Sequence, residues 1–553
     1  MKSNKKFKWL IGIPALIFSL FFAGIKSSEY FEISKNLDIF ASVVRELNNY
    51  YVDPIKPGEL IKNGIDAMLE KLDPYTVYIS EAEIEDYKIM TTGHYGGIGS
   101  VIQQRDGYIM IVQPYENSPA VKAGLMAGDL IVEVNGISTK GKSIDEVRNI
   151  LMGQPGTTVI LKVKRPFKEE EFMVDVLRED VKIKDVPYAG MIKNGIGYIK
   201  LNSFTETASK ELKEAFLELK EKQGMKALVI DLRNNGGGLL REAVAIVNFF
   251  IDKGKTVVMT KGKLEEWDKV HKTTSVPLDK DIPLVILVNE NSASASEIVA
   301  GALQDYDRAV LIGKNTFGKG LVQNIVPLSY NAQLKVTVAK YYIPSGRCIQ
   351  KIDYSHKDEN GEPLPVPDSL KRKFNTLYSK RPVFDGDGIT PDIIIEDTKT
   401  TPLIVALIQN HVIFDFATLF RQKNADISNP STFDIDEKIY AEFQQFAESK
   451  KLQYKSETFE HWEEFKKAAG KENYDKILAE EYKNIERKIK PDIKKDLELS
   501  KETIKLLLGS EIVSRYYYQK GEIQFYLHHD PYIDSALKVL GDPAYYQKIL
   551  SGM

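Results

Sequence analysis

A cluster of serine residues lies where an expected strand runs into an expected helix. The apolar run 284–288 predicts a buried strand, and residues 291–297 (Asn-Ser-Ala-Ser-Ala-Ser-Glu) follow it before a helical stretch. A serine at such a turn is exposed, and the first N–H groups of the helix can stabilise an oxyanion beside it. However, Ser294 and Glu297 also have the spacing of a capping box. From this stretch alone, a helix cap is the better interpretation.

A glycine-rich loop follows at residues 313–320 (Gly-Lys-Asn-Thr-Phe-Gly-Lys-Gly). It nearly matches the phosphate-binding pattern G-x-x-x-x-G-K-[ST], but Gly320 replaces the hydroxyl residue that would hold Mg²⁺. The next residues, 321–326, look like a strand, whereas a phosphate-binding loop opens a helix. We therefore do not expect a nucleotide at this loop.

The composition narrows the remaining chemistry. The 553 residues, 43% of them hydrophobic, suggest several folded domains at roughly 100–200 residues each. Cys348 is the only cysteine, so we expect no internal disulfide and no cysteine-based zinc site. No histidine lies between His271 and His356, and there is no H-E-x-x-H motif, so we expect no metal, with a site built only from carboxylates as the open alternative. We expect no other cofactor. The net charge of −3, without a basic patch interleaved with aromatic residues, predicts no nucleic-acid partner.

The first 28 residues predict a targeting segment. Lysines at positions 2, 5, 6 and 8 precede an apolar run from Trp9 to Ile25, which is the pattern of a charged n-region and an apolar h-region. The run approaches the roughly 20 residues that a membrane span needs, and no A-x-A cleavage site follows it. We expect an uncleaved signal anchor that leaves the chain in the extracytoplasmic, periplasm-facing part of the cell envelope. A cleaved signal peptide is the alternative.

The rest of the chain divides into four regions. Residues 29–91 are expected to form a helical, packed collar, and residues 92–180 alternate short strands and turns. Residues 181–398 alternate buried strands with helices, which predicts an α/β core with a polar inserted loop at 351–385. Residues 399–553 are expected to be α-helical, either as a solvated bundle or as an oligomerisation surface. In the collar, the apolar residues with a helical period are Phe40, Val43, Val44, Leu47 and Tyr51.

A second glycine-rich segment, Tyr95-Gly96-Gly97-Ile98-Gly99, stands directly before an expected strand. Such a loop can turn several N–H groups toward one anion, and the free carboxylate of a peptide suits that nest. An exposed edge strand beside it can pair with the last residues of a substrate. The segments that follow in order are Ser118-Pro119-Ala120, Ala123-Gly124-Leu125, Gly128-Asp129 and Val134-Asn135-Gly136. With this ordered set, residues 92–180 closely resemble a PDZ domain, which binds protein C-termini.

The serine and lysine segments belong to a longer ordered set of motifs. The set comprises Leu72–Thr76, Asp231–Gly238, Ser292–Glu297, Ala300–Asp305, Thr316–Gly320, Tyr342–Arg347 and Gly388–Asp392. Over about residues 35–397 the chain resembles the C-terminal processing peptidases, also called tail-specific proteases. The resemblance implies a serine endopeptidase with a crotonase-like α/β core and an inserted PDZ domain.

The resemblance also implies roles for individual residues. It makes Ser294 the nucleophile, Lys319 the base and Gln323 the residue that orients the lysine. It places the oxyanion hole at the backbone N–H groups of Gly237 and Ala295, although the choice among three neighbouring glycines stays open.

A serine-lysine pair is chemically reasonable. A lysine accepts a proton only when neutral, so its ordinary pKa of about 10.4 must fall toward about 7–8. Desolvation can supply that shift, and we expect Phe317 with the neighbouring apolar strand to provide a dry wall. A Ser-His-Asp triad would need His271, and the lack of histidine in residues 272–355 favours the lysine.

These features together predict a membrane-tethered serine endopeptidase that processes or degrades envelope proteins. Its substrates are expected to be polypeptides with free C-termini, and the family resemblance implies that these ends are apolar. We also expect a homo-oligomer through the helical regions. Two alternatives remain open: a catalytically silent PDZ adaptor that binds tails without cleaving them, and a crotonase-like acyl-handling enzyme. Intact Ser294, Lys319 and Gln323 argue against the adaptor, and no acyl-CoA signature stands out.

Overall fold

The computed structural model describes residues 9–168, 170–193, 195–396, 400–474 and 476–552, with side chains from residue 30 onward except that of residue 86. The chain forms two compact units. The first consists of Met1–Ala82 and Gln323–Thr337, and the second of Glu83–Val322 and Val338–Met553. The second unit contains a mainly β region, an α/β core and a helical region.

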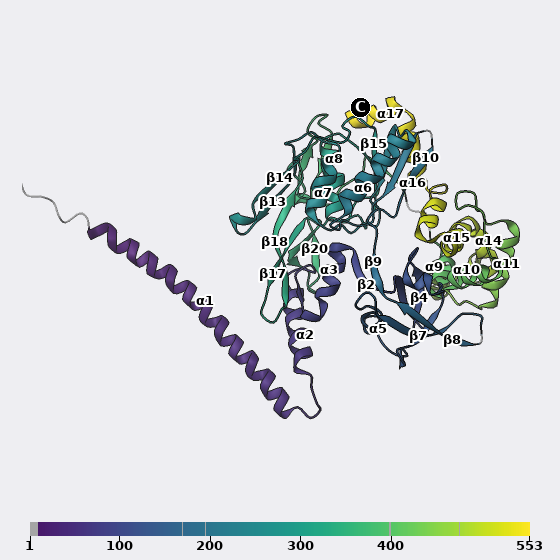
Figure 1. Cartoon of the computed structure of the whole chain (residues 1–553), viewed down its shortest axis with the longest axis horizontal. Coiled ribbons are helices and arrows are strands. Elements are labelled where there is room, and N and C mark those ends of the chain that lie inside the picture. Colours follow the sequence, from purple (N-terminus) through teal and green to yellow (C-terminus); the bar gives the residue numbers. More distant parts are fainter. Residues whose placement is uncertain (1–8, 169, 194, 397–399, 475, 553) are drawn as a thin grey trace, which may run out of the picture. The chain divides into compact units, whose positions relative to one another are not determined.

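The first unit is built on two helices and a short strand. α1 (Trp9–Tyr50) is the long purple helix in Figure 1, and α2 (Pro57–Glu70) and β1 (Val77–Ile79) follow it. Val77 of β1 pairs with Lys335 in the first half of β18 (Gln333–Tyr342). The segment expected to target the chain, residues 1–28, lies outside the described side chains.

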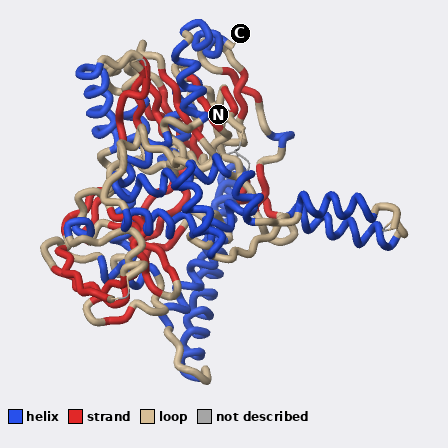
Figure 2. The backbone as a smooth tube through the Cα atoms, turned by 90° about the vertical axis from the view of Figure 1, so that its right-hand side faces the viewer, coloured by secondary structure: helices blue, strands red, loops and turns tan. Residues whose placement is uncertain are grey.

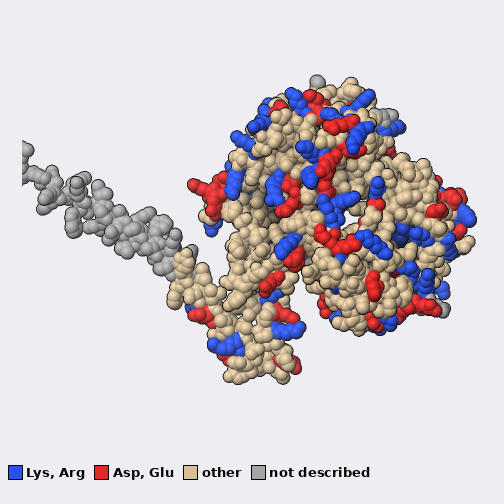
Figure 3. Space-filling view, in the orientation of Figure 1, with Lys and Arg blue, Asp and Glu red and all other residues tan. Residues whose placement is uncertain are grey.

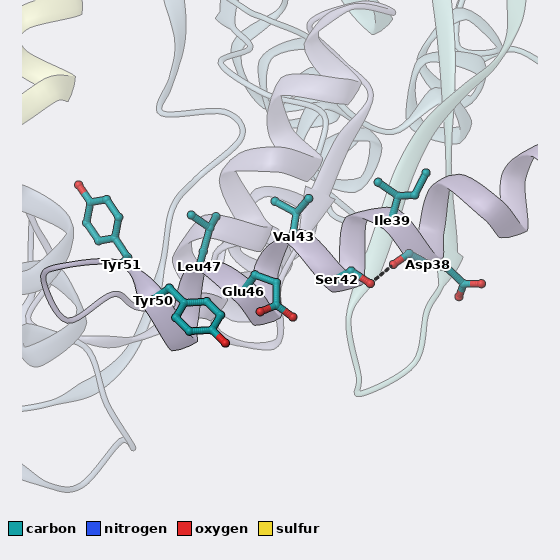
Figure 4. Close-up of a pocket in the computed structure, with 8 residues that line it drawn as sticks. All are labelled: Asp38, Ile39, Ser42, Val43, Glu46, Leu47, Tyr50 and Tyr51. Carbon is teal, nitrogen blue, oxygen red and sulfur yellow. Dashed lines mark hydrogen bonds between the residues drawn. The ribbon is translucent and has the colours of Figure 1, made fainter.

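The apolar side chains of α1 are exposed, which corrects the expectation of a packed collar. Val43 is 50% exposed and Leu47 is 40% exposed. Figure 4 shows Ile39, Val43 and Leu47 along one side of the helix, where they line an open hollow together with Tyr50 and Tyr51. The helical period predicted the helix itself, but a period does not specify that a packing partner exists within the same chain.

The mainly β region begins after α3 (Ile84–Thr92). Its six-stranded sheet has the order β3-β4-β5-β7-β8, with β6 beside β5, and β2 pairs separately with β9. The strands are β2 (His94–Gly97), β3 (Ser100–Arg105), β4 (Tyr108–Pro114), β5 (Leu130–Val134), β6 (Ile137–Ser138), β7 (Thr158–Lys164), β8 (Glu171–Leu177) and β9 (Glu179–Lys182). Alternating residues of these strands, such as Ile109 and Ile111, pack with α4 (Pro119–Lys122) and α5 (Ile144–Leu151) into one core.

The α/β core contains a second six-stranded sheet with the order β10-β11-β12-β15-β16-β23. β11 through β23 are parallel, and β10 is antiparallel to β11. The strands are β10 (Tyr188–Lys193), β11 (Ile196–Lys200), β12 (Ala227–Asp231), β15 (Leu284–Val288), β16 (Val310–Gly313) and β23 (Ile393–Ile394). Parallel strands of this kind are buried on both faces, which explains why β12 and β15 read as continuous apolar runs.

Helices cover both faces of this sheet (Figure 1, Figure 2). Leu228 and Ile230 of β12 pack with α6 (Ala208–Leu217), α7 (Leu240–Val247) and α8 (Ala295–Asp305). Val229, one residue between them, belongs to the opposite cluster with α16 (Pro531–Gly541) and α17 (Pro543–Ser551). The end of the helical region expected at 399–553 therefore supplies the second layer of the α/β core rather than part of a separate bundle.

The preceding helices form a core of their own. Buried residues of α9, α10, α11, α14 and α15 make up this cluster. The helices are α9 (Pro402–Gln409), α10 (Val412–Lys423), α11 (Glu437–Ser449), α12 (Glu457–Lys471), α13 (Ala479–Ile489), α14 (Ile493–Leu499) and α15 (Lys501–Tyr526). Arg105 of β3 makes a two-pronged ion pair with Asp415 of α10, at 2.6 and 2.8 Å, which ties the mainly β region to these helices.

The remaining strands complete the core near the lysine loop. β13 (Thr256–Gly262) pairs with β14 (Lys269–Lys272) and with the second half of β18. β17 (Leu321–Pro327) pairs with β18. The segment 351–385, expected to be an inserted loop, instead contains two antiparallel strand pairs, which residues 358–362 and 376–381 connect. Their strands are β19 (Ile352–Lys357), β20 (Pro363–Pro365), β21 (Lys373–Asn375) and β22 (Pro382–Phe384).

Among the described residues, no single helix is both long and apolar enough to cross a membrane. The bent pair α9–α10 is so by length and composition alone. Basic and acidic side chains are interspersed over the visible face of the second unit (Figure 3).

Candidate active site

The three serines of residues 292–296 have different surroundings. Ser292 and Ser296 are fully buried. Ser292 Oγ donates to the carbonyl of Leu232 at 2.8 Å, and Ser296 Oγ donates to the carbonyl of Asn235 at 2.9 Å. Ser294 is only partly buried. The outer serines therefore hold the turn against the loop after β12, and the middle serine is the one that solvent reaches.

Ser294 has an unusual backbone conformation. It directly precedes α8 with φ 57° and ψ −112°, whereas ordinary helix caps are extended. Ser118 and Ser143, which cap α4 and α5, are extended, with φ values of −71° and −70°. A residue other than glycine at positive φ is strained, and such strain concentrates at functional sites. The conformation of Ser294 thus differs from that of the ordinary caps in the same chain.

Gly237 lies directly against this serine turn. A methyl group at Gly237 would come within 2.8 Å of both Ser294 Cβ and the nitrogen of Ala295, so only glycine fits, and its φ of 97° also favours glycine. A methyl group at Gly236 would meet nothing within 4 Å. The N–H of Gly237 donates to Oδ1 of Asn235 at 2.9 Å. If the Gly237 N–H stabilised an oxyanion, its hydrogen bond to Asn235 would have to be shared with the oxyanion or broken.

A buried carboxyl group joins the serine turn to the lysine loop. Glu297 Oε2 accepts the N–H groups of Ser294 and Lys319, at 2.8 and 2.9 Å. Its Oε1 accepts the N–H of Gly318 at 2.8 Å and the hydroxyl of Thr316 at 2.5 Å. Burial raises the pKa of Glu297 from 4.5 to about 7, although these hydrogen bonds oppose the rise. The capping glutamate of the sequence pattern therefore also fixes the loop that carries the lysine.

A buried tyrosine makes a second connection between the same two residues. The hydroxyl of Tyr341, on β18, donates to the carbonyl of Lys319 and lies 3.2 Å from the carbonyl of Ser294. A phenol has one hydrogen, so the two carbonyls share it. The N–H of Tyr341 donates to the carbonyl of Gly320 at 2.9 Å. Glu297 thus joins the two N–H groups, and Tyr341 joins the two carbonyls.

The surroundings of Lys319 differ in one respect from expectation. Lys319 is partly buried. The ring of Phe317, expected to be its dry wall, is 46% exposed, although its neighbours Thr316 and Gly318 are bonded to buried Glu297. The buried apolar neighbour in sequence is Leu321, at the start of β17.

Gln323 belongs to the first unit. Its side-chain Nε2 donates to the hydroxyl of Thr337 at 3.1 Å, and that hydroxyl donates to Asp73 Oδ1 at 3.2 Å. The second unit therefore brings Ser294, Ala295, the Gly237 loop and the Lys319 loop together, whereas Gln323 is held by residues of the first unit.

The expected carboxylate-binding loop is partly a strand, which is a correction. Tyr95, Gly96 and Gly97 belong to β2, because their backbone pairs with β9, with Tyr95 opposite Val181. Only Ile98 and Gly99 form the turn, and Gly99 has a φ of 72° that favours glycine. The carbonyl of Ile98 accepts the N–H of Ala120 at 2.8 Å. Burial raises the pKa of the Tyr95 phenol, and backbone hydrogen bonds from the turn partly oppose that rise.

Two further motifs meet in a buried ion pair that the sequence did not reveal. Arg347 Nη2 lies 3.0 Å from Asp305 Oδ1 and 2.8 Å from Gln304 Oε1. The N–H of Ser345 donates to Asp305 Oδ2 at 2.8 Å. These bonds anchor the end of α8 to the turn after β18. Asp305 and Arg347 each belong to a motif found in the sequence, but their pairing depends on a contact between segments far apart in the chain.

Comparison with known families agrees with this architecture. Residues 195–356 match peptidase family S41, residues 110–165 match the PDZ domain, and residues 403–540 match the probable PDZ-protease, C-terminal helical domain. The fold and these matches define a serine protease that carries a PDZ domain.

Individual relatives give the family. The chain is 36% identical over 334 residues to a carboxy-terminal-processing protease of Bartonella bacilliformis, a match that spans 60% of this chain and 76% of that protein. It is 41% identical over 316 residues to a probable CtpA-like serine protease of Staphylococcus aureus, spanning 57% of this chain and 62% of that protein. A solved photosystem II D1 C-terminal processing protease is 27% identical, with a TM-score of 0.35, over 65% of this chain and 92% of that one. The chain belongs to the C-terminal processing proteases of peptidase family S41, as its motifs predicted.

Proposed function

We propose that this protein is an endopeptidase that binds substrate C-termini through its PDZ domain and cleaves with Ser294 as nucleophile, Lys319 as base and Gln323 as the residue that orients the lysine. The observation that carries the proposal is the double connection between the nucleophile turn and the lysine loop. Glu297 and Tyr341 hold the main chains of Ser294 and Lys319 at both their N–H and carbonyl groups. A fixed pair of this kind suits proton transfer between two side chains.

In the first half of the proposed reaction, the neutral amine of Lys319 takes the Ser294 hydroxyl proton while Oγ attacks the scissile carbonyl. N–H groups at Ala295 and the Gly237 loop hold the resulting oxyanion. The lysine ammonium then gives its proton to the leaving amine, the C–N bond breaks and an acyl-enzyme remains. In the second half, Lys319 takes a proton from water, the hydroxide attacks the ester, and Ser294 leaves with the proton restored.

The proposed substrates are polypeptides with free, apolar C-termini. The carboxylate would bind at the turn formed by Ile98 and Gly99, beside Tyr95, Gly96 and Gly97, and the preceding residues would pair with an edge strand. β3 is the terminal strand in the order of its sheet, so it offers an edge for such pairing. Binding through main-chain groups would accept many sequences, and apolar pockets would set the preference.

The proposed location is the extracytoplasmic side of the cell envelope, with the apolar run from Trp9 to Ile25 as a membrane anchor. Fractionation of cells that produce the full chain tests this location: protein released by high salt without detergent would contradict an anchor. We also propose self-association through the exposed apolar side of α1, because exposed apolar stripes of this kind mark interaction surfaces.

The central experiment follows cleavage of an unfolded substrate with an apolar C-terminus by wild type, Ser294→Ala and Lys319→Ala. Both variants should bind the substrate tail as wild type does and cleave it at least about 10³-fold more slowly, since each removes a group that reacts. Equal cleavage by wild type and Ser294→Ala would refute the proposed nucleophile. Binding without cleavage by all three proteins would favour a silent PDZ adaptor.

A second experiment separates tail binding from chemistry. The same substrate is supplied with its natural carboxylate, with a C-terminal amide and without its last few residues. Loss of the carboxylate should raise KM more than it changes kcat, because the nest contacts a part of the substrate that does not react. Identical kinetics for all three substrates would contradict recognition of the free C-terminus.

A further inference from the structure

A chain of hydrogen bonds in the first unit ends at Gln323. Gln323 Nε2 donates to Thr337 Oγ1 at 3.1 Å, and Thr337 Oγ1 donates to Asp73 Oδ1 at 3.2 Å. The main chain of Thr337 is held as well, since its N–H donates to Thr76 Oγ1 at 3.2 Å and Thr76 Oγ1 donates to Asp73 Oδ2 at 3.0 Å. Asp73 and Thr76 are buried, and they come from the Leu72–Thr76 motif, which carried no role in the chemistry above.

Asp73 determines which atom donates and which accepts in this series of hydrogen bonds. Asp73 Oδ1 accepts the N–H groups of Tyr75 and Thr76, at 2.8 and 2.9 Å, so this oxygen acts as an acceptor toward Thr337 as well. A threonine hydroxyl has one hydrogen, so the hydrogen of Thr337 goes to Asp73. Toward Gln323, the same oxygen must then accept.

It follows that the amide of Gln323 has one favoured orientation. Its NH₂ group faces Thr337, and its carbonyl oxygen is at the opposite end of the amide. If the amide were turned, its carbonyl oxygen would face the Thr337 oxygen. The single hydroxyl hydrogen of Thr337 could then not bond to both Gln323 and Asp73. Networks of this kind are what decide the orientation of a side-chain amide.

We infer that Asp73 and Thr337 are positioning residues that fix the amide of Gln323 in the orientation its proposed role requires, with the carbonyl oxygen turned away from Thr337. The inference rests on the proposed role of Gln323, which follows Lys319 by four residues. Orienting a lysine amine requires an acceptor for its hydrogens, whether the amine is neutral or protonated, and the turned amide would present two hydrogens instead. The Leu72–Thr76 motif thereby gains a role in catalysis without touching the substrate.

The test compares Thr337→Val, which keeps the shape and removes the hydroxyl, with Thr337→Ser, which keeps the hydroxyl. We expect Thr337→Val to lower kcat about tenfold with KM unchanged, and Thr337→Ser to retain most of the activity. Thr273→Val is the matched control, since it removes a buried hydroxyl that donates to the Asp252 carbonyl at 2.7 Å in the second unit. It should leave kcat within about twofold of wild type. Wild-type kcat in Thr337→Val would overturn the inference, and so would a loss of the same size in Thr273→Val.

A double-mutant cycle separates positioning from general structural damage. If Thr337 acts through Gln323, adding Thr337→Val to Gln323→Ala should change kcat by less than about twofold. A further tenfold loss in the double variant would overturn the inference while Ser294 and Lys319 kept their roles. Unimpaired cleavage by Gln323→Ala would also overturn it. Unimpaired cleavage by Ser294→Ala would instead refute the proposed function itself, so the two failures are distinguishable.

Discussion

Replacement of Glu297 by glutamine changes one oxygen of a buried carboxyl to an NH₂ group. Glu297 accepts four hydrogen bonds, three of them from backbone N–H groups and one from the Thr316 hydroxyl. In either orientation, the NH₂ of glutamine would face at least one backbone N–H. Because a buried donor without an acceptor costs about 1–3 kcal/mol, kcat/KM should fall roughly 5- to 150-fold if the cost appears in the transition state.

The same substitution should change how stability depends on pH. Burial raises the pKa of Glu297 from 4.5 to about 7, so between these values the folded chain holds a proton that the unfolded chain has released. A raised carboxyl pKa contributes stability that is complete below about pH 4.5 and is lost as pH rises through about 7. A shift of this size corresponds to about 3 kcal/mol. Glutamine does not titrate, so the wild type should lose about 3 kcal/mol relative to Glu297→Gln between pH 4 and pH 8.

Urea denaturation at a series of pH values, combined with cleavage assays on the same preparations, measures both effects. Glu522 provides a matched control, because burial and the neighbouring Glu511 raise its pKa to about 7 as well, and it lies on α15 outside the proposed machinery. Glu522→Gln should alter the pH dependence of stability and leave cleavage unchanged. Parallel stability curves for wild type and Glu297→Gln would refute the buried titration. Unchanged kcat/KM in Glu297→Gln would refute its role in holding Ser294 and Lys319.

Three further predictions follow from packing. Gly237→Ala should reduce kcat/KM at least about 100-fold, because its methyl group would lie 2.8 Å from Ser294 Cβ. Gly236→Ala has room for the methyl group and should cleave within a few-fold of wild type. Equal rates for the two variants would contradict the geometry. Arg347→Met should lower the free energy of unfolding by about 3–5 kcal/mol in urea denaturation, because it leaves Asp305 buried and unpaired, and a loss below about 1 kcal/mol would show that the pair is not buried in solution. Leu47→Glu on α1 should lower the oligomeric state measured by light scattering if that face binds a second copy, and an unchanged mass would argue against self-association there.

Much of the fold could be predicted from local patterns. The apolar runs 227–231 and 284–288 identified central strands because parallel strands are buried on both faces. Ordered motifs led to the PDZ domain and the C-terminal processing peptidases, and the comparisons with known proteins support both. Local patterns did not predict which other segment a helix packs against. The period of α1 did not reveal that its apolar side is exposed, and the helical C-terminus did not reveal that α16 and α17 cover the core sheet.

The sequence by itself determined which residues could do chemistry. Ser294 stands between an apolar strand pattern and a helical pattern, and Lys319 stands within a glycine-rich run, so both features are local. Only the tertiary structure decided how the three serines differ, since the bonds of Ser292 and Ser296 reach a loop some sixty positions earlier in the chain. Glu297 is a second example. Its spacing from Ser294 indicated a helix cap, but its carboxyl oxygens also accept hydrogen bonds from Thr316, Gly318 and Lys319 of the lysine loop. Hydrogen bonds between distant segments depend on where folding brings the chain, and no local period or propensity encodes that placement.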